Sequence, residues 1–373
     1  MKISFFLTCI SLSLLMNAQT ATPQYLAAGT YTGGKSEGIY ILAFDTATGS
    51  LRQHTVTKAS NPSFVTVSPD GKYVYAVHEN GSDQGGGSIS AYAFNTDEGR
   101  LRLLNTLPTQ GDHPCHAETD KTGKWVIASN YSGGNFTVYP VQEDGSLGAA
   151  TASIQHYGKG KNPERQEKPH VHSATISPDN NWLFVADLGT DQLVLYRMAA
   201  DGKPEAGTAA KTNPGDGPRH FTFHPNGKYA YAVQELSGKI ITYDYKDGKL
   251  RQVQRISTLA DGEKDFAGSA DIHVSPDGKF VYATNRGNYN NIAIYQVNPK
   301  NGRLDVVGFQ STLGKGPRNF TIDPSGRFLL VANQNSDEIV VFSRNRESGL
   351  LDDTGHRLAI GKPVCLQWIG GLN

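Results

Sequence analysis

Residues 68–77 read SPDGKYVYAV, a tight turn that runs directly into an alternating strand. Proline presets the backbone φ of a turn, and the glycine accepts the positive φ that closes it. Aromatic and β-branched residues with a period of two are typical of a β-strand. The pattern recurs along the chain, and the residues that close the successive turns are Gly71, Gly123, Asn180, Gly227, Gly278 and Gly326.

These turns divide the chain into similar units, each with four strand-like segments. One segment precedes the turn and a second follows it. A third apolar run comes next, as in residues 89–94 and 292–295, and a fourth segment begins after an Asp/Asn-Gly-type turn, as at Gly302. Four short strands in about 40 to 50 residues are typical of one blade of a β-propeller.

A seventh unit is split between the two ends of the chain. Residues 25–31 and 38–44 resemble a second and a third strand that lack a first, and residues 363–368 resemble a first strand alone. Pairing the two ends closes the ring and leaves no open sheet edge. We therefore predict an all-β fold, a single seven-bladed β-propeller over residues 22–373. A stack of β-sandwich domains does not explain the split unit.

The first 21 residues have the layout of a secretory signal peptide. Lys2 precedes an apolar run over residues 3–16, and small or polar residues follow. The run is shorter than the roughly 20 residues that span a bilayer. We predict cleavage of residues 1–21 and an exported protein, periplasmic or extracellular. The remaining cysteines, Cys115 and Cys365, are predicted to be free and buried.

The composition limits the kinds of partner. Lys and Arg number 35, as do Asp and Glu, so the formal net charge is zero. A general nucleic-acid binder normally carries a basic surplus. No stretch after residue 21 is apolar enough to cross a bilayer. We expect no nucleic-acid or membrane partner, and a monomer.

The repeat also indicates where polar side chains meet. Residues seven or eight positions before and after the closing residue of each turn lie together, at the end of the hairpin opposite the turn. These positions are rich in Arg, His, Glu, Asp and Asn and belong to the two innermost strands of every blade, so we expect them at one mouth of the channel. A water-filled channel explains the Asn and Ser side chains, but it explains the charged residues of both signs less well. The candidates at these positions include His116, His172, Arg219, His220, Glu235, Asn285, Arg286 and Arg318.

A long connection, residues 151–168, enters one of these first strands near the predicted mouth. It carries Lys159, Lys161, Arg165 and Lys168. Two interpretations are open, a flap over His172 and a mobile surface loop.

Five segments resemble the propeller lactonase family, which includes bacterial 6-phosphogluconolactonases and the fungal carboxy-cis,cis-muconate cyclase. They are KPHVH at 168–172, GPRHF at 217–221, QELS at 234–237, NRG at 285–287 with IAIY at 292–295, and GPRNF at 316–320. The resemblance covers residues 24–371. It implies that His172, Arg219, Glu235 and Arg286 form the catalytic set.

The implied reaction is hydrolysis of a sugar-derived, anionic lactone by water, without a metal or other cofactor. Glu235 is the candidate general base, or the acid that protonates the leaving alkoxide, and His172 is the alternative for either role. Arg219 and Arg286 would hold an anionic group and stabilise the oxyanion. We expect Glu235→Gln and Arg219→Ala each to lower turnover about 10²-fold or more and to leave folding intact.

Further substrate contacts are predicted at His116, His170, His220, Asn285 and Arg318. Whether His170 or His172 acts in the reaction is open, although the repeat favours His172.

Three other functions are considered. A metal-dependent sugar lactonase needs hard oxygen ligands. Possible ones are Glu79, Asn130, Asp187 and Asn285, but no local motif groups them, and we expect no metal. A non-catalytic propeller that binds a glycan or a protein would carry aromatic platforms instead of charges at the mouth. A cycloisomerase of the muconate type is the third, because members of one fold catalyse different reactions.

Overall fold

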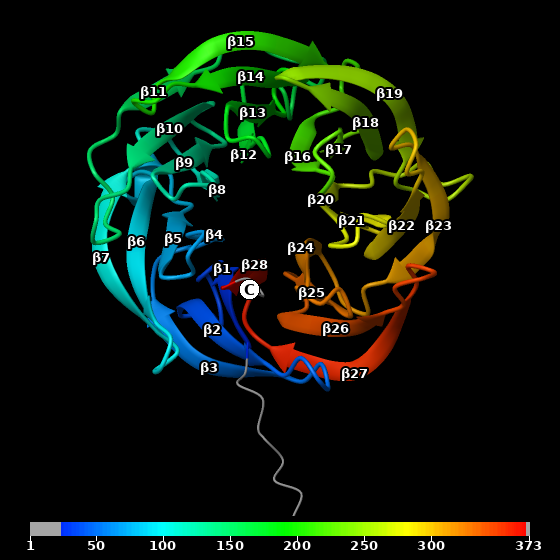
Figure 1. The fold of residues 1–373 in the computed structure, drawn as a ribbon, viewed down its shortest axis with the longest axis horizontal. Coiled ribbons are helices and arrows are strands. Elements are labelled where there is room, and N and C mark those ends of the chain that lie inside the picture. Colours follow the sequence, from blue (N-terminus) through cyan, green and yellow to red (C-terminus); the bar gives the residue numbers. More distant parts are fainter. Residues whose placement is uncertain (1–23, 371–373) are drawn as a thin grey trace, which may run out of the picture.

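The computed structural model describes residues 24–370, so the predicted signal peptide lies outside the described residues. Within this range the chain forms seven four-stranded antiparallel sheets arranged as the blades of a ring (Figure 1). The prediction of a seven-bladed β-propeller is confirmed. The one described helix is a single turn, η1 (Ser82–Gln84), and no described helix has the length and apolarity needed to cross a membrane.

The four strands of each blade run from the channel to the periphery. The innermost strands are β4 (Phe64–Val67), β8 (Pro114–Thr119), β12 (Val171–Ile176), β16 (Pro218–Phe223), β20 (Ser269–Val274), β24 (Pro317–Ile322) and β28 (Pro363–Ile369). The second strands are β1 (Gln24–Thr30), β5 (Tyr73–His78), β9 (Trp125–Asn130), β13 (Trp182–Asp187), β17 (Tyr229–Gln234), β21 (Phe280–Asn285) and β25 (Phe328–Asn333).

The outer half of each blade is built in the same way. The third strands are β2 (Gly38–Phe44), β6 (Ser88–Asn95), β10 (Asn135–Pro140), β14 (Gln192–Met198), β18 (Lys239–Lys246), β22 (Asn291–Val297) and β26 (Glu338–Arg344). The outermost strands are β3 (Leu51–Lys58), β7 (Arg100–Pro108), β11 (Ala152–Gln155), β15 (Pro204–Lys211), β19 (Lys249–Ser257), β23 (Leu304–Ser311) and β27 (Leu351–Ala359).

The two ends of the chain close the ring as predicted. β28 pairs antiparallel with β1, with Tyr25 opposite Ile369 and Ala28 opposite Leu366. The repeated turns also have the predicted backbone, because the six residues that close them have φ values between 62° and 72°. Asn180, the one closing residue with a side chain, has the lowest of these, φ 62°.

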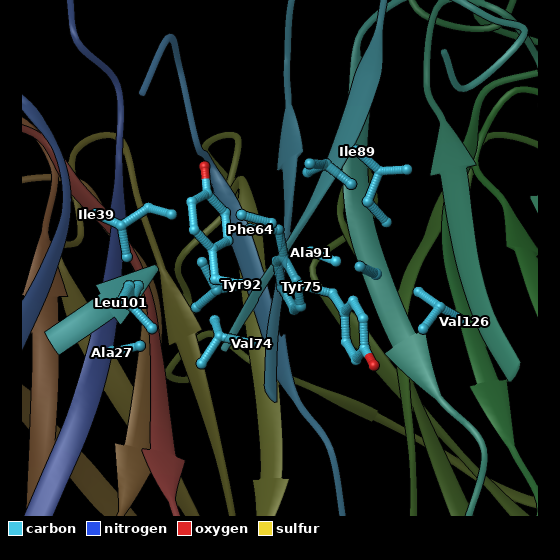
Figure 2. Packing of buried hydrophobic residues seen from close by; sticks show 14 of the residues in the cluster. Ala27, Ile39, Phe64, Val74, Tyr75, Ile89, Ala91, Tyr92, Leu101 and Val126 are labelled. Atoms are coloured by element: carbon cyan, nitrogen blue, oxygen red, sulfur yellow. The ribbon is translucent and has the colours of Figure 1, made fainter. Parts of the chain in front are cut away.

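The hydrophobic core lies between neighbouring blades. Figure 2 shows Val74 and Tyr75 of β5 packed between Ile39 of the preceding blade and Val126 of the following one, and all four side chains are buried. Burying a side chain of this size contributes about 1.5 to 3 kcal/mol. The Tyr75 hydroxyl also donates to the Gly145 carbonyl of the next blade at 3.2 Å. Each blade is therefore stabilised mainly by its neighbours.

A β-bulge interrupts the innermost strand of several blades. Pairing passes from Val171 to Ser173 and omits His172. The same shift omits Cys115 in β8, Arg219 in β16 and Arg318 in β24. An extra residue in a bulge takes no place in the ladder and can direct its side chain differently from its neighbours. The bulges therefore place four chemically active side chains near one end of the channel.

Both described cysteines are free and buried, as predicted. Each thiol contacts a neighbouring blade: Cys115 Sγ lies 3.3 Å from the His172 carbonyl, and Cys365 Sγ lies 3.6 Å from the Val65 carbonyl. Burial raises the pKa of Cys365 to about 12, and it raises the pKa of Cys115 as well. The two thiols therefore help to join innermost strands.

Candidate active site

A pocket of about 500 Å³ opens at the end of the channel opposite the repeated turns. Three of its side chains, Cys115, His172 and Arg318, are bulge residues of innermost strands. Five others follow directly after a second strand, namely Tyr31, Glu79, Tyr131, Glu235 and Arg286, and the remaining lining residues are Arg165, Phe266 and Gly268. Two rings of positions, repeated from blade to blade, thus supply most of the wall.

Glu235 is the centre of a buried ion cluster. Its Oε1 lies 2.6 Å from Arg165 Nη2, and its Oε2 lies 3.0 Å from Arg219 Nε and 3.1 Å from Arg286 Nη2. Burial favours the neutral acid, but the three guanidinium groups outweigh it and lower the pKa of Glu235 to about 2. Glu235 is therefore a carboxylate at neutral pH, with both oxygens engaged, and has no proton to donate to a leaving group.

Arg219 does not line the pocket but lies behind Glu235, and its side chain is only 2% exposed. Its Nη1 donates to the Ala270 carbonyl of the next blade. Burial, followed by the nearby cations Arg286 and Arg318, lowers the pKa of Arg219 to about 9, so it remains charged at neutral pH. This position differs from the predicted direct contact with substrate. The reason is that Glu235 lies between the guanidinium and the cavity.

His172 presents a neutral imidazole to the pocket. Burial, followed by the charge of Arg219, holds the pKa of His172 well below its usual value. Its Nδ1 lies 3.8 Å from Cys115 Sγ, and Tyr131 packs edge-on against its ring. No other residue in the described range forms a hydrogen bond with the ring, which leaves Nε2 available to a ligand.

A second polar group lies beside Arg318. The Tyr31 hydroxyl donates to Glu79 Oε2 at 2.7 Å, and the Arg318 guanidinium lies 5.4 Å from the centre of the Tyr31 ring. Such a cation–π contact positions the guanidinium without neutralising it.

The connection from β11 to β12 has many fixed contacts. The buried Gln166 Nε2 donates to the Leu188 carbonyl at 2.8 Å and to Asp191 Oδ1 at 2.7 Å. Lys168 Nζ reaches the Ser132 carbonyl at 2.8 Å. Arg165 extends from this connection to Glu235 and to the Tyr131 hydroxyl. These contacts favour the interpretation of a cover over the pocket, with Arg165 as part of the wall.

The pocket attracts anions. Its described lining carries three guanidinium groups against two carboxylates, and the guanidinium of Arg219 lies directly behind it. Charges in a partly buried cavity are screened less than those on an open surface. The arrangement suits a ligand that is negatively charged, or that becomes so during a reaction.

His116 and His220 do not line this pocket, although the His220 ring packs edge-on against that of His172, with the ring centres 5.3 Å apart. They line a second cavity of about 460 Å³ on the turn side of the channel, together with Phe64 and Asp271. Each directly follows a bulge residue, and neighbouring residues of a strand point in different directions. The prediction counted both positions toward one mouth, which the structure does not support.

Two other predicted substrate contacts are engaged by the protein itself. His170 stacks on Tyr131, and its Nε2 lies 3.1 Å from Glu167 Oε1. Asn285 is fully buried, donating to the Thr258 carbonyl at 2.7 Å and accepting from Ser269 Oγ at 2.7 Å. Neither residue lines the pocket. Of the two histidines, His172 is the one that the structure places at the site.

Seven lining residues were not among the predicted site residues, namely Tyr31, Glu79, Cys115, Tyr131, Arg165, Phe266 and Gly268. Arg165 was assigned only to the possible flap, and Glu79 only to a possible metal site. Tyr31 was overlooked because its blade is split between the ends of the chain, although it occupies the same position after a second strand as Glu235. Phe266 belongs to the connection from β19 to β20, where the repeat gives no signal.

The possible oxygen ligands for a metal are dispersed. Asp187 accepts from the His170 amide and lies 2.9 Å from His156 Nδ1, and Asn130 donates to the Thr109 carbonyl. Within residues 24–370, no group of three His, Cys, Asp or Glu side chains is arranged to hold a metal ion.

The fold and the site together define a class, a seven-bladed propeller with a cationic pocket and a neutral imidazole at one mouth. Comparison with known families is more specific. The model of the family described as "Lactonase, 7-bladed beta-propeller" matches residues 25–368. The chain belongs to this family, and membership places it among the lactonases, hydrolases of carboxylic esters.

The similarity to known relatives extends over almost their full length. A 6-phosphogluconolactonase of Bacillus subtilis is 38% identical over 344 residues, which cover 91% of this chain and 97% of the relative. A 6-phosphogluconolactonase of Formosa agariphila is 39% identical, with 91% and 98% covered. The periplasmic gluconolactonase of Pseudomonas aeruginosa has a similar structure, with a TM-score of 0.89, 37% identity, and 94% and 99% of the two chains covered.

Proposed function

We propose that the pocket hydrolyses a sugar-derived lactone that carries an anionic group, by a metal-independent attack of water on the ester carbonyl. The observation that carries this proposal is the meeting of a neutral imidazole, His172, with a surplus of guanidinium groups in one pocket of a lactonase-family propeller. An imidazole can move protons, and guanidinium groups can hold both a substrate anion and the oxyanion of the reaction.

His172 is the proposed general base. Its Nε2 takes a proton from the attacking water as the water oxygen bonds to the carbonyl carbon. The carbonyl oxygen becomes an oxyanion, which Arg286 or Arg318 stabilises. Collapse of this intermediate breaks the ring C–O bond, and the proton on His172 passes to the leaving alkoxide. The product is an open-chain hydroxy acid, which ionises at neutral pH.

Glu235 has a different proposed role. Its Oε1 accepts from Arg165 and its Oε2 forms ion pairs with Arg219 and Arg286, and its low pKa makes it a weak base. Its charge fixes the directions of Arg165 and Arg286, which line the pocket. We therefore assign proton transfer to His172 and the placement of the cations to Glu235.

The relatives are named for lactones with and without a phosphate. Two relatives are named for a phosphorylated lactone, and the Pseudomonas neighbour is named for the unphosphorylated one. The positive pocket favours a phosphate or carboxylate on the substrate.

Export is also part of the proposal, supported by the layout of residues 1–21 and by the periplasmic location stated for the Pseudomonas neighbour. Intact-mass analysis of the protein from a periplasmic or culture fraction tests it, with a start after residue 21 expected and an unprocessed Met1 contradicting it.

The activity is tested by proton release from purified protein on glucono-1,5-lactone, 6-phosphogluconolactone and a neutral aliphatic lactone, with and without EDTA. We expect turnover that survives EDTA, is highest on an anionic substrate and is lost in His172→Gln. The matched control is His54→Gln, a half-buried histidine on the outermost strand β3 that does not line the pocket. No turnover of any lactone by the folded protein would refute the proposal, and turnover lost with EDTA would refute the metal-independent mechanism.

A further inference from the structure

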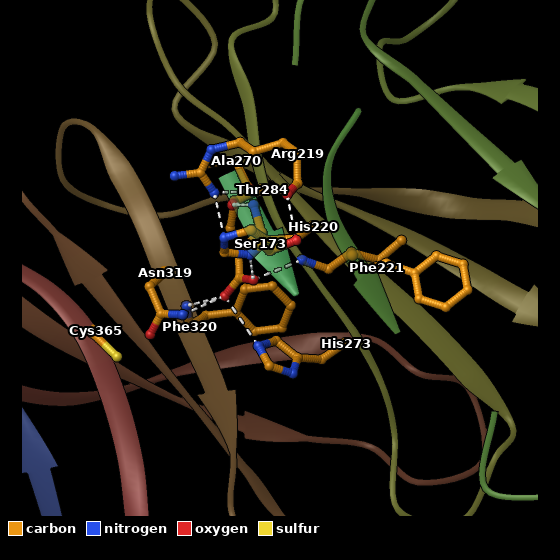
Figure 3. Close-up of polar contacts among 12 residues, drawn as sticks. Ser173, Arg219, His220, Phe221, Ala270, His273, Thr284, Asn319, Phe320 and Cys365 are labelled. Atoms are coloured by element: carbon orange, nitrogen blue, oxygen red, sulfur yellow. Dashed lines mark hydrogen bonds and ion pairs between the residues drawn. The ribbon is translucent and has the colours of Figure 1, made fainter. Parts of the chain in front are cut away.

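Arg219 is contacted from behind by a histidine that does not reach the pocket. His220 Nε2 lies 3.2 Å from Arg219 Nη1, and His220 Nδ1 lies 2.7 Å from Asp271 Oδ1. Figure 3 shows His220 and Arg219 beside the innermost strand of the next blade, which carries Asp271. With the ion pair from Arg219 to Glu235, these contacts form a continuous chain of polar side chains from the second cavity to the pocket.

Asp271 is the fixed end of this chain of side chains. Its carboxylate is buried and accepts from His220, His273 Nε2 at 3.0 Å, Asn319 Nδ2 at 2.6 Å and the Phe320 amide at 3.1 Å. These donors come from three neighbouring blades. A buried carboxylate with this many donors stays ionised and cannot turn without breaking several hydrogen bonds.

The ionised Asp271 determines the tautomer of His220. A carboxylate can only accept, so the hydrogen of a neutral His220 ring must be on Nδ1. Nε2 then carries a lone pair and accepts from the Arg219 guanidinium, which can only donate. Burial, followed by the charge of Arg219, lowers the pKa of His220 to about 4, so the ring is neutral near pH 7.

We propose that Asp271 and His220 are positioning residues that hold Arg219, and through it Glu235, in the orientation the pocket needs. Neither residue touches the substrate, and the predicted substrate contact at His220 is replaced by this role. The catalytic part of the inference rests on the proposed lactonase function, whereas the tautomer and the orientation of Arg219 are properties of the protein alone.

Two variants at His220 test the hydrogen bonds of its two ring nitrogens one at a time. The amide of Asn resembles the Nδ1 end of histidine, so His220→Asn keeps a donor to Asp271 and loses the acceptor for Arg219. The amide of Gln resembles the Nε2 end, so His220→Gln keeps an acceptor for Arg219. We expect kcat to fall about 10-fold or more in His220→Asn, with a smaller change in KM, and to be substantially restored in His220→Gln.

His273→Gln is the matched control. His273 is also a donor to Asp271, at 3.0 Å, but has no contact with Arg219. This variant should lose stability to a similar extent while keeping the wild-type kcat. A purely structural role for His220 predicts the opposite pattern, in which all three variants change melting temperature and none changes kcat. That pattern would overturn the proposal.

A measurement without substrate separates this inference from the proposed function. The ¹⁵N shifts of the His220 ring in the wild-type protein report its tautomer, and the Arg219 Nε signal, assigned with Arg219→Lys, reports the order of the guanidinium. We expect the Nδ1–H tautomer, and an Arg219 signal that shifts or broadens in His220→Asn but not in His273→Gln. An Nε2–H tautomer in the wild type, or an unchanged Arg219 signal in His220→Asn, would overturn the positioning role whether or not any lactone is hydrolysed.

Discussion

Replacing Glu235 with glutamine should reduce the stability of the folded protein by about 3 kcal/mol at pH 7. The structure lowers the pKa of this buried carboxyl from 4.5 to about 2. A tenfold change in proton affinity corresponds to about 1.4 kcal/mol, so the ionised form gains about 3 kcal/mol over the neutral one. The variant leaves the buried Arg219 and the half-buried Arg286 without their anion, and breaking a buried ion pair costs about 3 to 5 kcal/mol.

The effect has a definite pH dependence. Because the folded-state pKa is depressed, the stabilisation is complete above the unfolded-state value near 4.5 and is lost as the pH falls through about 2. The difference between wild type and variant should therefore shrink from about 3 kcal/mol at pH 7 to about 1.4 kcal/mol at pH 3. This result would correct the expectation from sequence that Glu235→Gln leaves folding intact.

The assay is urea unfolding of both proteins at pH 7 and pH 3. Glu347→Gln is the control, because Glu347 also pairs with a cation, Lys279, but its side chain is 85% exposed. Exposed pairs of this kind contribute little. Equal stability of wild type and Glu235→Gln at pH 7, or a difference that stays constant on acidification, would refute the reasoning from the ion cluster.

Three other predictions concern the pocket and one thiol. His172→Gln should lower kcat about 10² to 10⁴-fold. Burial and the charge of Arg219 hold the pKa of His172 well below 6.5. Wild-type activity should therefore stay constant as the pH falls from 8 to 6.5 and decline only at lower pH. A pH–rate profile that falls near 6.5 would contradict this. Arg318→Gln should lower kcat/KM on a phosphorylated lactone about 10-fold or more and affect a neutral lactone less, and equal losses on both would exclude Arg318 as the anion ligand. Cys365, buried with a raised pKa, should react with a thiol reagent only after unfolding, and rapid labelling of Cys365 in the native protein would show that the innermost strands open.

Much of the fold followed from local patterns in the sequence. The closing residues of the turns have a conformation that few residue types accept, so Gly71 and its equivalents marked six of the seven blades clearly. The split blade could be inferred because residues 363–368 have the pattern of a first strand without a turn after it. These features depend on neighbouring residues and on backbone preference, which a sequence displays directly.

Only part of the site could be predicted from the sequence, because assigning residues to one end of the channel by their position in the repeat assumes regular strand pairing. The bulges at His172 and Arg219 direct these side chains toward one end of the channel and His220 toward the other, and a sequence does not show where pairing shifts. The position of Glu235 in front of Arg219 was equally hidden. Both residues lie at the same end of one hairpin, since Pro218 pairs with Gln234, but the bulge at Arg219 determines the direction of its side chain, and no local pattern encodes that bulge.

The bulges also bear on how such a protein changes over time. Irregular pairing occurs between the first and second strands in six of the seven blades, and the extra residue takes no place in the ladder. The backbone therefore places little demand on the identity of these side chains, which include Val364 as well as His172 and Arg318. A lineage can exchange them, one blade at a time, provided that buried charges stay balanced. Ring architecture and chemical specificity are then inherited separately, and new substrates can be acquired without a new fold.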